Sequence, residues 1–222
     1  MSFWRYLQDR RGDLLEYALL HLEVVLIAIG IATVIGVGLG IAVAGHRRSR
    51  AVMLGITGAL LTVPSFALFG LLIPLFAAIS PDLGLGLAPT LTALILYAIF
   101  PILRNTVTGL EEVPAEVVDA GRGMGLSGAR LMWLVRLPIA WPVIVNGVRV
   151  STIMTIGIAA IAAAVDGPGL GQPIFDGLNR SGGANALNDT LAGLLGLAAL
   201  ALLLDVVFLA LTWLTTPRGI RG

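Results

Sequence analysis

The sequence predicts an all-α integral membrane protein with five transmembrane helices, and three observations support this fold class. Of its 222 residues, 57% are hydrophobic and only 12% are charged. The mean hydropathy is +0.95, so the chain lacks the polar side chains that a water-facing surface needs. Finally, five separate stretches approach or exceed the roughly 20 apolar residues that a transmembrane helix requires.

The five predicted spans divide the chain into short connections and one long one. They run over Leu22–Gly45, Ala51–Ile79, Leu87–Leu103, Pro138–Val165 and Leu191–Thr215. The second contains Pro64 and Pro74, which predict a kinked or broken helix. Gly36 and Gly40 in the first have the spacing of close helix packing, and general packing is favoured over a specific dimer contact.

The termini are expected to lie outside the spans. Residues 1–21 are charged throughout and lack the apolar core of a cleavable signal peptide. Phe3, Trp4 and Tyr6 lie beside arginines there, which is typical of an amphipathic helix at the membrane interface. Residues 22–216 then form the transmembrane domain, and residues 217–222 form a cytoplasmic tail.

The distribution of arginine predicts that the N-terminus is outside and the C-terminus is cytoplasmic, because cytoplasmic flanks retain positive charge. In this orientation nine arginines lie on inner segments and four on outer ones. The inner ones are Arg47, Arg48, Arg50, Arg104, Arg122, Arg130, Arg136, Arg218 and Arg221, and the outer ones are Arg5, Arg10, Arg11 and Arg180.

The composition also excludes several kinds of chemistry. The chain has no cysteine, and all 14 of its basic residues other than histidine are arginine. Without a lysine it has no phosphate-binding loop of the kind that hydrolyses ATP. It shows no catalytic motif and no metal-ligand motif, and His21 and His46, both at span ends, are expected to be interfacial anchors. The net charge of +1 indicates no nucleic-acid partner.

The segment from Arg104 to Leu137 is the longest connection on the predicted cytoplasmic side. A short amphipathic helix is expected to begin near Pro114 and to end at Gly121, Gly123 and Gly125. Ser127 is a candidate N-cap for a second helix. The two helices would form a rigid knob that another protein can grip.

Within this segment, the spacing Asp119-Ala120-Gly121, three residues, Gly125, nine residues, Val135-Arg136-Leu137-Pro138 resembles the Glu-Ala-Ala loop of ABC importer permeases. Three positions differ from the family pattern, with Asp119 for Glu, Gly121 for Ala and Val135 for Ile. The resemblance implies a loop, 104–137, that docks in a groove of the ATPase. The implied docking residues are Glu116, Asp119, Ala120, Gly121, Gly125, Leu126, Ser127, Leu137 and Pro138.

Three further segments, 63–69, 96–106 and 166–171, resemble the branch of these permeases that imports glycine betaine, choline, carnitine and related osmoprotectants. The resemblance implies the type I ABC importer permease fold, in a prokaryotic plasma or inner membrane. It also implies three kinds of protein partner: a cytoplasmic ABC ATPase dimer that holds the ATP and Mg, a second permease chain, and an extracytoplasmic substrate-binding protein. A paralogue is favoured over a copy as the second permease. This chain itself would hold no cofactor and would not be an enzyme.

Small, weakly polar residues are the candidates for the translocation pathway, because a transported zwitterion must bind briefly and then leave. They are Thr62, Pro64, Ser65, Asn105, Asn146, Thr152 and Thr155, and for each the alternative is ordinary helix packing. No aromatic cage for a quaternary ammonium group is evident, so headgroup specificity is expected in the binding protein. Gly167, Gly169, Leu170 and Gly171 are candidates for an external gate that contacts the binding protein.

Arg149 and Asp205 lie at similar depths in the fourth and fifth spans. Because an unpaired charge in a bilayer is costly, an ion pair between them is one hypothesis. The alternatives are that each faces an aqueous pathway, or that Arg149 reaches the cytoplasmic surface. Two other functions stay open: a permease for amino acids or methionine, and a secondary transporter, which would show inverted repeats or paired intramembrane acids.

Overall fold

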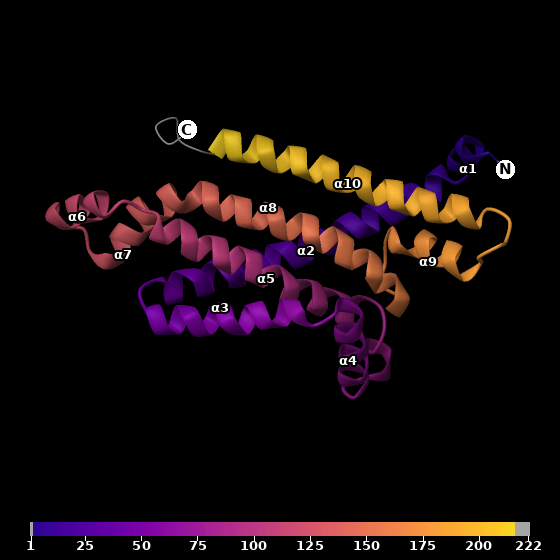
Figure 1. Ribbon diagram of the computed structural model, residues 1–222, viewed down its shortest axis with the longest axis horizontal. Coiled ribbons are helices and arrows are strands. Elements are labelled where there is room, and N and C mark those ends of the chain that lie inside the picture. The colour runs from indigo at the N-terminus through magenta and orange to yellow at the C-terminus, as the bar shows by residue number, and fades with distance from the viewer. Residues whose placement is uncertain (1, 216–222) are drawn as a thin grey trace.

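The computed structural model describes residues 2–215, and every regular element in this part of the chain is a helix (Figure 1). The α-helices are α1 (Phe3–Asp9), α2 (Arg11–Ala44), α3 (Arg47–Thr62), α4 (Ser65–Ala77), α5 (Leu87–Glu111), α6 (Ala115–Gly123), α7 (Gly128–Leu131), α8 (Leu137–Ile161), α9 (Gly171–Asn179) and α10 (Ala186–Thr215). The remaining helical elements are two short 3-10 helices, η1 (Pro81–Leu83) and η3 (Ala162–Val165), and one π-helix, η2 (Met132–Arg136).

Within residues 2–215, four helical segments are long and apolar enough to cross a membrane, and the bent pair α3 and α4 makes a fifth when it is counted as one span. The four are α2, α5, α10 and the continuous run from Gly128 to Val165. The predicted fold class is therefore confirmed. The predicted tail, with Arg218 and Arg221, lies outside the described residues.

Helix α5 lies at the centre of the bundle and packs against α2 and α8. Their shared core contains Ala28 from α2, Leu94 and Ile102 from α5 and Ile156 from α8, all at most 2% exposed. Gly36 and Gly40 of α2 also face α5, where a Cβ at Gly40 would lie 2.5 Å from Cγ2 of Thr106. These glycines therefore permit close packing between two helices of the same chain.

The second span is broken, not just kinked. Pro64 has no N–H to continue the helix and pushes the preceding residue, Val63, into an extended conformation. Helices α3 and α4 consequently meet at 97°, and α4 stands across the direction of the bundle (Figure 1). Pro74 lies inside α4 without breaking it.

The N-terminal region differs from the sequence-based expectation in two ways. Helix α2 begins at Arg11 and so crosses the boundary expected between residues 21 and 22, because no proline interrupts this stretch. His21 is not an interfacial anchor: it is 0% exposed, and its Nε2 lies 3.1 Å from the carbonyl oxygen of Ile156. Long-range packing against α8, which the sequence alone does not reveal, explains this difference.

Helix α8 also extends further back than expected. The second helix of the long connection does not stop before Pro138 but runs through α7 and η2 directly into α8. Helix α5 likewise continues to Glu111. As a result, much of the 104–137 connection is a continuation of two spans, and α6 with its two flanking turns is the part that joins them.

Candidate functional site

The turn between α6 and α7 has a defined geometry that depends on one glycine. The backbone N–H of Leu126 donates to the carbonyl of Gly121, and that of Gly125 donates to Arg122, as in a Schellman motif. Gly125 has a φ of +80°, which an L side chain rarely adopts. Ser127 then caps α7, since its Oγ accepts from the N–H of Arg130 at 3.5 Å. The predicted helix, glycine turn and N-cap are confirmed.

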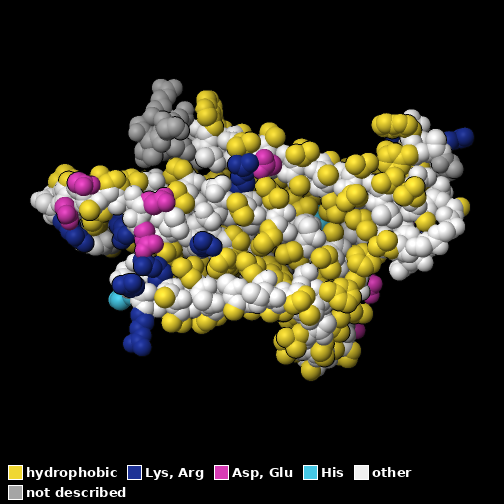
Figure 2. All heavy atoms as spheres, in the orientation of Figure 1, with side chains coloured by type: hydrophobic (Ala, Val, Ile, Leu, Met, Phe, Trp, Pro, Cys, Tyr) yellow, Lys and Arg dark blue, Asp and Glu magenta, His cyan; other side chains and the backbone are white. Residues whose placement is uncertain are grey.

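Residues 115–127, hereafter the knob, project from one end of the bundle. Glu116, Asp119 and Ala120 are exposed, and so are the apolar side chains of Met124 at 75% and Val117 at 39%. Asp119 pairs with Arg122 at 3.2 Å on this surface. Figure 2 shows charged side chains gathered at this end and a mostly hydrophobic surface along the bundle. The knob thus offers a mixed charged and apolar face that no part of the described chain covers.

The base of the knob is tied to the ends of the spans. Gly121 is buried, and a Cβ there would lie 2.6 Å from Cδ1 of Leu131 in α7. Arg136 of η2 donates from Nη2 to the carbonyl of Leu110, at the end of α5, at 2.8 Å. An ion pair between Arg50 and Glu111 links α3 to the same end of α5. The knob thus packs on α7, while the helix ends beside it, those of α3, α5 and η2, are bonded to one another.

Leu137 and Pro138, which the family pattern groups with the knob, lie elsewhere. They begin α8 and line an apolar groove of about 340 Å³ against α2, together with Trp133 and Trp141. Leu137 also packs near Ile144 and Leu110. These two residues anchor the span and are not on the knob surface.

Three pathway candidates lie together at the broken helix. Thr62, Pro64 and Ser65 line a cavity of about 320 Å³ between the α3–α4 break, α5 and α8. Tyr97 of α5 and Met154 of α8 complete its wall. Sequence reasoning did not single out these last two, although Tyr97 lies within one of the family-like segments.

The other four pathway candidates do not line this cavity. Thr152 and Thr155 are 0% exposed within the helix packing, and the Thr152 hydroxyl donates to Val148 one turn earlier. Asn105 donates to Pro101 and lies where Gly147 of α8 approaches α5. Asn146 is exposed on α8. The positions of Thr152, Thr155 and Asn105 fit the alternative of ordinary helix packing, and all four residues stay predictions for the pathway.

The four gate candidates, Gly167, Gly169, Leu170 and Gly171, are buried in a tight turn, while Asp166 beside them is exposed. A Cβ at Gly167 would lie 2.6 Å from that of Ala162, and one at Gly171 would lie 2.1 Å from the carbonyl oxygen of Ala160. Gly169, with a φ of +121°, lies against His21. Leu170 is only 2% exposed. The exposed part of this connection is instead Leu178–Ala184.

Arg149 and Asp205 form a bidentate ion pair between α8 and α10. Nε of Arg149 donates to Oδ1 of Asp205 at 2.7 Å, and Nη2 donates to Oδ2 at 2.9 Å. The two side chains are 29% and 26% exposed. Because only 6% of the most apolar window of α10 is buried in the chain, this pair is one of the few strong contacts that hold the helix.

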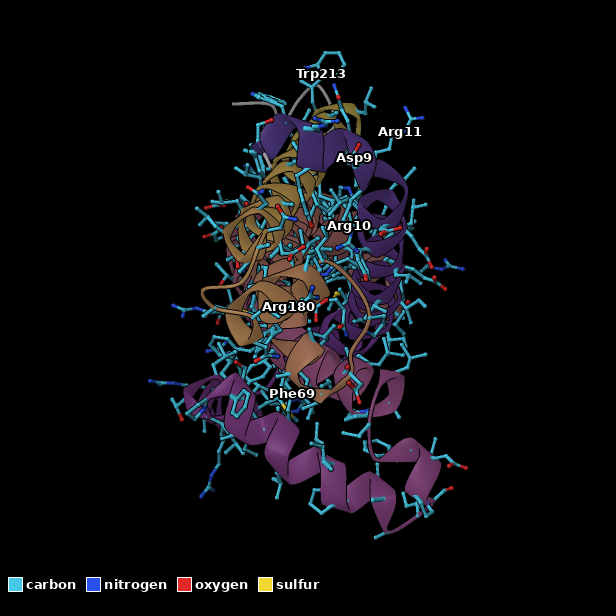
Figure 3. The ribbon with its side chains drawn as sticks, turned by 90° about the vertical axis from the view of Figure 1, so that its right-hand side faces the viewer. Asp9, Arg10, Arg11, Phe69, Arg180 and Trp213 are labelled. Atoms are coloured by element: carbon cyan, nitrogen blue, oxygen red, sulfur yellow. The ribbon has the colours of Figure 1, made fainter. Side chains whose placement is uncertain are left out.

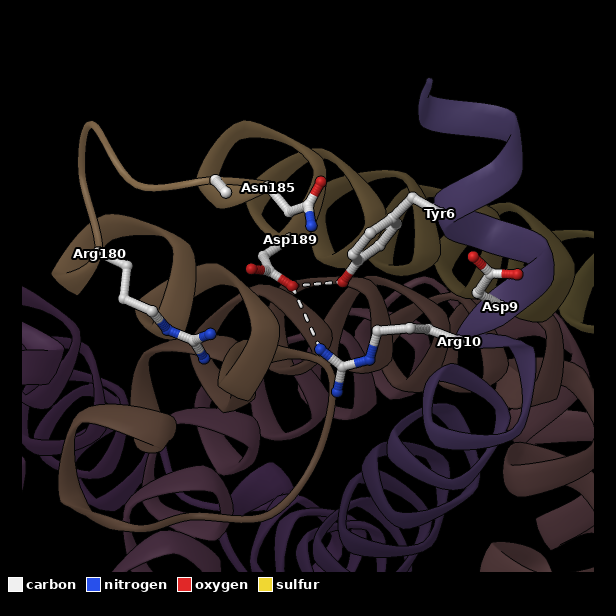
Figure 4. Close-up of a pocket in the computed structure, with 7 residues that line it drawn as sticks. Tyr6, Asp9, Arg10, Arg180, Asn185 and Asp189 are labelled. Carbon is white, nitrogen blue, oxygen red and sulfur yellow. Dashed lines mark hydrogen bonds and ion pairs between the residues drawn. The ribbon is translucent and has the colours of Figure 1, made fainter. Parts of the chain in front are cut away.

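A second polar cluster joins α1 to the start of α10, 183 residues away in sequence. Figure 4 shows the Tyr6 hydroxyl donating to the Asp189 carboxylate, to which Nη1 of Arg10 also donates at 3.4 Å. Asp189 is only 3% exposed. Burial and this carboxylate raise the pKa of Tyr6 to about 12. Figure 3 looks onto this end, where Asp9, Arg10 and Arg180 are labelled; the α6 knob is at the other end of the bundle (Figure 1).

Comparisons with known proteins agree with this arrangement. Residues 33–218 match the family described as "Binding-protein-dependent transport system inner membrane component". The chain is 41% identical to the osmoprotectant import permease protein OsmW of Salmonella typhimurium, over 100% of both chains. It is 35% identical to the glycine betaine/carnitine/choline transport system permease protein OpuCB of Bacillus subtilis, over 98% of this chain and 95% of that protein.

Among solved structures, a chain from the inward-facing MetNI methionine ABC transporter superposes with a TM-score of 0.83. The match covers 98% of this chain and 100% of that chain, at 23% sequence identity. At this identity the likeness concerns the fold alone.

Proposed function

Since the chain belongs to the family of binding-protein-dependent transport system inner membrane components, we propose that it is a permease subunit of an ATP-driven importer for glycine betaine, choline, carnitine or related osmoprotectants. Full-length similarity to permeases named for these compounds carries the proposal. The chain supplies the pathway, and the free energy comes from ATP bound with Mg in a partner ATPase. The fold match to a methionine transporter, at 23% identity, is too distant in sequence to favour that substrate.

The knob is the surface that engages the ATPase. Its exposed Glu116, Asp119 and Met124 supply charge and apolar area, its base packs on α7 at Gly121, and the adjoining η2 is hydrogen-bonded to α5. When the ATPase subunits close, the knob moves with them, and its ties move the attached spans as rigid bodies. This assignment makes the knob end cytoplasmic and places the N-terminus outside, in agreement with the arginine distribution.

The other partners are a second permease, favoured as a paralogue, and a binding protein on the outer side. The exposed segment Leu178–Ala184 lies at the end of the bundle opposite the knob. It is better placed to meet the binding protein than the packed turn at Gly167–Gly171, where the glycines leave no room for a partner.

Purification and reconstitution test this function together. The chain is tagged and extracted in mild detergent from membranes that also produce its neighbouring subunits, and the copurifying proteins are identified by mass spectrometry. The complex is then placed in liposomes with its binding protein, and uptake of radiolabelled glycine betaine, choline, carnitine and methionine is measured.

We expect an ATPase subunit in the complex and ATP-dependent uptake of at least one quaternary ammonium compound. Uptake of methionine alone would replace the substrate assignment and leave the permease role intact. Uptake without any copurifying ATPase, driven by an ion gradient, would overturn the importer itself.

A further inference from the structure

The cavity at the α3–α4 break has a wall that suits one chemical class of ligand. Thr62, Pro64 and Ser65 form one side, and Tyr97 and Met154 form another. Among the described residues none of its lining side chains is charged. Its volume of about 320 Å³ is at the lower end of the range for small-molecule sites.

A quaternary ammonium group fits such a wall better than a primary ammonium does. A primary ammonium has three N–H donors that each need an acceptor, and the lining side chains offer it only the hydroxyls of Thr62, Ser65 and Tyr97 and no carboxylate, so desolvating it here is costly. A trimethylammonium group has no N–H donor to satisfy. Aromatic rings and diffuse negative potential favour such a group, and one aromatic ring, that of Tyr97, is part of the cavity wall.

Tyr97 supplies the aromatic surface and is held firmly in place. It is only 3% exposed, and its hydroxyl donates to the carbonyl oxygen of Val63 at 2.6 Å. The same bond fixes the ring against the helix break. The carbonyl oxygens of Leu60 and Val63 accept from the N–H of Val63 and from Tyr97. The C-terminal end of α3 carries partial negative charge, which the break places beside the cavity.

The cavity also lies at a suitable depth. Tyr97 is ten residues after Leu87, the first residue of α5, and therefore about 15 Å along this helix. That is about half the thickness of a bilayer's hydrocarbon core. Broken helices at the membrane midplane are frequent elements of transport sites.

We propose that this cavity is a transient binding site for the quaternary ammonium headgroup of the substrate, and that Tyr97 is its specificity-determining residue. The proposal rests on the function proposed above and adds a site within the permease to the selection made by the binding protein. With no opposite charge in its wall, the site holds the headgroup weakly, so that the substrate can leave it.

Thiol labelling provides the first test, because the chain has no cysteine of its own. A Ser65→Cys variant in the assembled complex carries one reactive thiol in the permease at the cavity. Its rate of reaction with a trimethylammonium methanethiosulfonate reagent is measured with increasing glycine betaine, dimethylglycine or glycine. A Ser49→Cys variant, on the exposed first turn of α3, is the control.

We expect glycine betaine to slow labelling of Ser65→Cys several-fold, dimethylglycine to slow it less, and glycine to have no effect. Labelling of Ser49→Cys should be unchanged by all three compounds. Equal labelling of Ser65→Cys with and without glycine betaine, in a complex that imports glycine betaine, would overturn the site alone. A complex that imports no quaternary ammonium compound would overturn the proposed function, and the site with it.

Uptake by Tyr97 variants provides the second test. Tyr97→Leu should lower glycine betaine uptake about tenfold at saturating binding protein, which corresponds to about 1.4 kcal/mol. Tyr97→Phe keeps the ring and should retain more than half of the uptake. Tyr17→Leu in α2 is the matched control. Equal losses in Tyr97→Leu and Tyr97→Phe would assign the effect to the hydroxyl bond at the helix break and would contradict the headgroup site.

Discussion

Two glycine-rich turns, one at each end of the bundle, use the same residue type for opposite purposes. In the knob, Gly123 and Gly125 are surrounded by open space, and Gly125 is required for its φ of +80°. In the turn at the other end, Gly167 and Gly171 each approach Ala162 or Ala160 so closely that no Cβ fits. The first turn is exposed to solvent, and the second is packed against the neighbouring helix.

This difference shows why a glycine motif cannot be assigned a role from its letters alone. Where glycine is needed only for its backbone angle, another residue can replace it with some loss of stability, and the turn stays exposed to a partner. Where glycine is needed because two backbone segments approach closely, the turn is part of the packed fold. Substitutions at the two turns should therefore separate coupling from folding.

The largest effect is expected from Gly171→Ala. Its Cβ would lie 2.1 Å from the carbonyl oxygen of Ala160, and because a backbone atom cannot move aside easily, we expect a loss of about 3 kcal/mol in the free energy of unfolding. Thermal unfolding in detergent, followed by size-exclusion chromatography, measures it. Gly157→Ala in the same helix as Ala160 meets no atom within 4 Å and should change little. An unaltered Gly171→Ala protein would show that the turn is not closed.

A selective loss of coupling is expected from Gly125→Val. The left-handed conformation costs an ordinary L residue about 1 to 2 kcal/mol, and we expect the knob to shift, with uptake falling by about tenfold and assembly of the complex preserved. The measurement is the ratio of uptake to ATP hydrolysis in liposomes. Gly125→Asn should recover most of the uptake, since asparagine tolerates this conformation, and Gly123→Ala should behave as wild type. If Gly125→Val unfolds the chain as Gly171→Ala does, the contrast between the turns is wrong.

Removing the ion pair between Arg149 of α8 and Asp205 of α10 should have an intermediate effect on stability. Arg149→Ala and Asp205→Ala each leave one charge in the membrane without its partner, so each variant should melt at a lower temperature than wild type. The double variant should be more stable than the sum of the two losses implies, and Arg149→Met with Asp205→Leu should recover most of the stability. Additive losses would mean that the two side chains act independently.

The smallest effect is expected from Tyr6→Phe at the outer end. Removing the hydroxyl that donates to Asp189 should cost about 1 kcal/mol, since Arg10 still donates to the same carboxylate. Because the folded state raises the pKa of Tyr6 from 10 to about 12, the contribution is complete below pH 10 and is lost as the pH rises through 12. Unfolding of wild type and variant at a series of pH values measures this. A difference that persists unchanged above pH 12 would contradict the hydrogen bond.

The sequence predicts the locally encoded parts of this molecule well. Pro64 breaks its helix, α6 begins after Pro114, and Ser127 caps α7, because each signal acts within a few residues. For Arg149 and Asp205 the sequence leaves three hypotheses open, and their similar depth in two spans suggests the ion pair. The structure contains this pair.

The parts that depend on distant packing were not predictable. The bond between Tyr6 and Asp189 joins residues 183 apart, and no local pattern marks it. Thr152 and Thr155 resemble pathway residues in sequence, but the face that each presents is decided by the neighbouring helices, which bury them. Tyr97 was missed for the same reason, since only the fold brings it to the α3–α4 break.

The close contact of Gly36 and Gly40 with Ile102 and Thr106 has a mechanical consequence. Two helices that touch at backbone distance cannot slide past each other without first separating, so α2 and α5 form a stiff pillar. Movement applied at the knob, as proposed above, would tilt this pillar as a whole and would not bend it. Bending is expected instead at the α3–α4 break, where two helices meet at 97°.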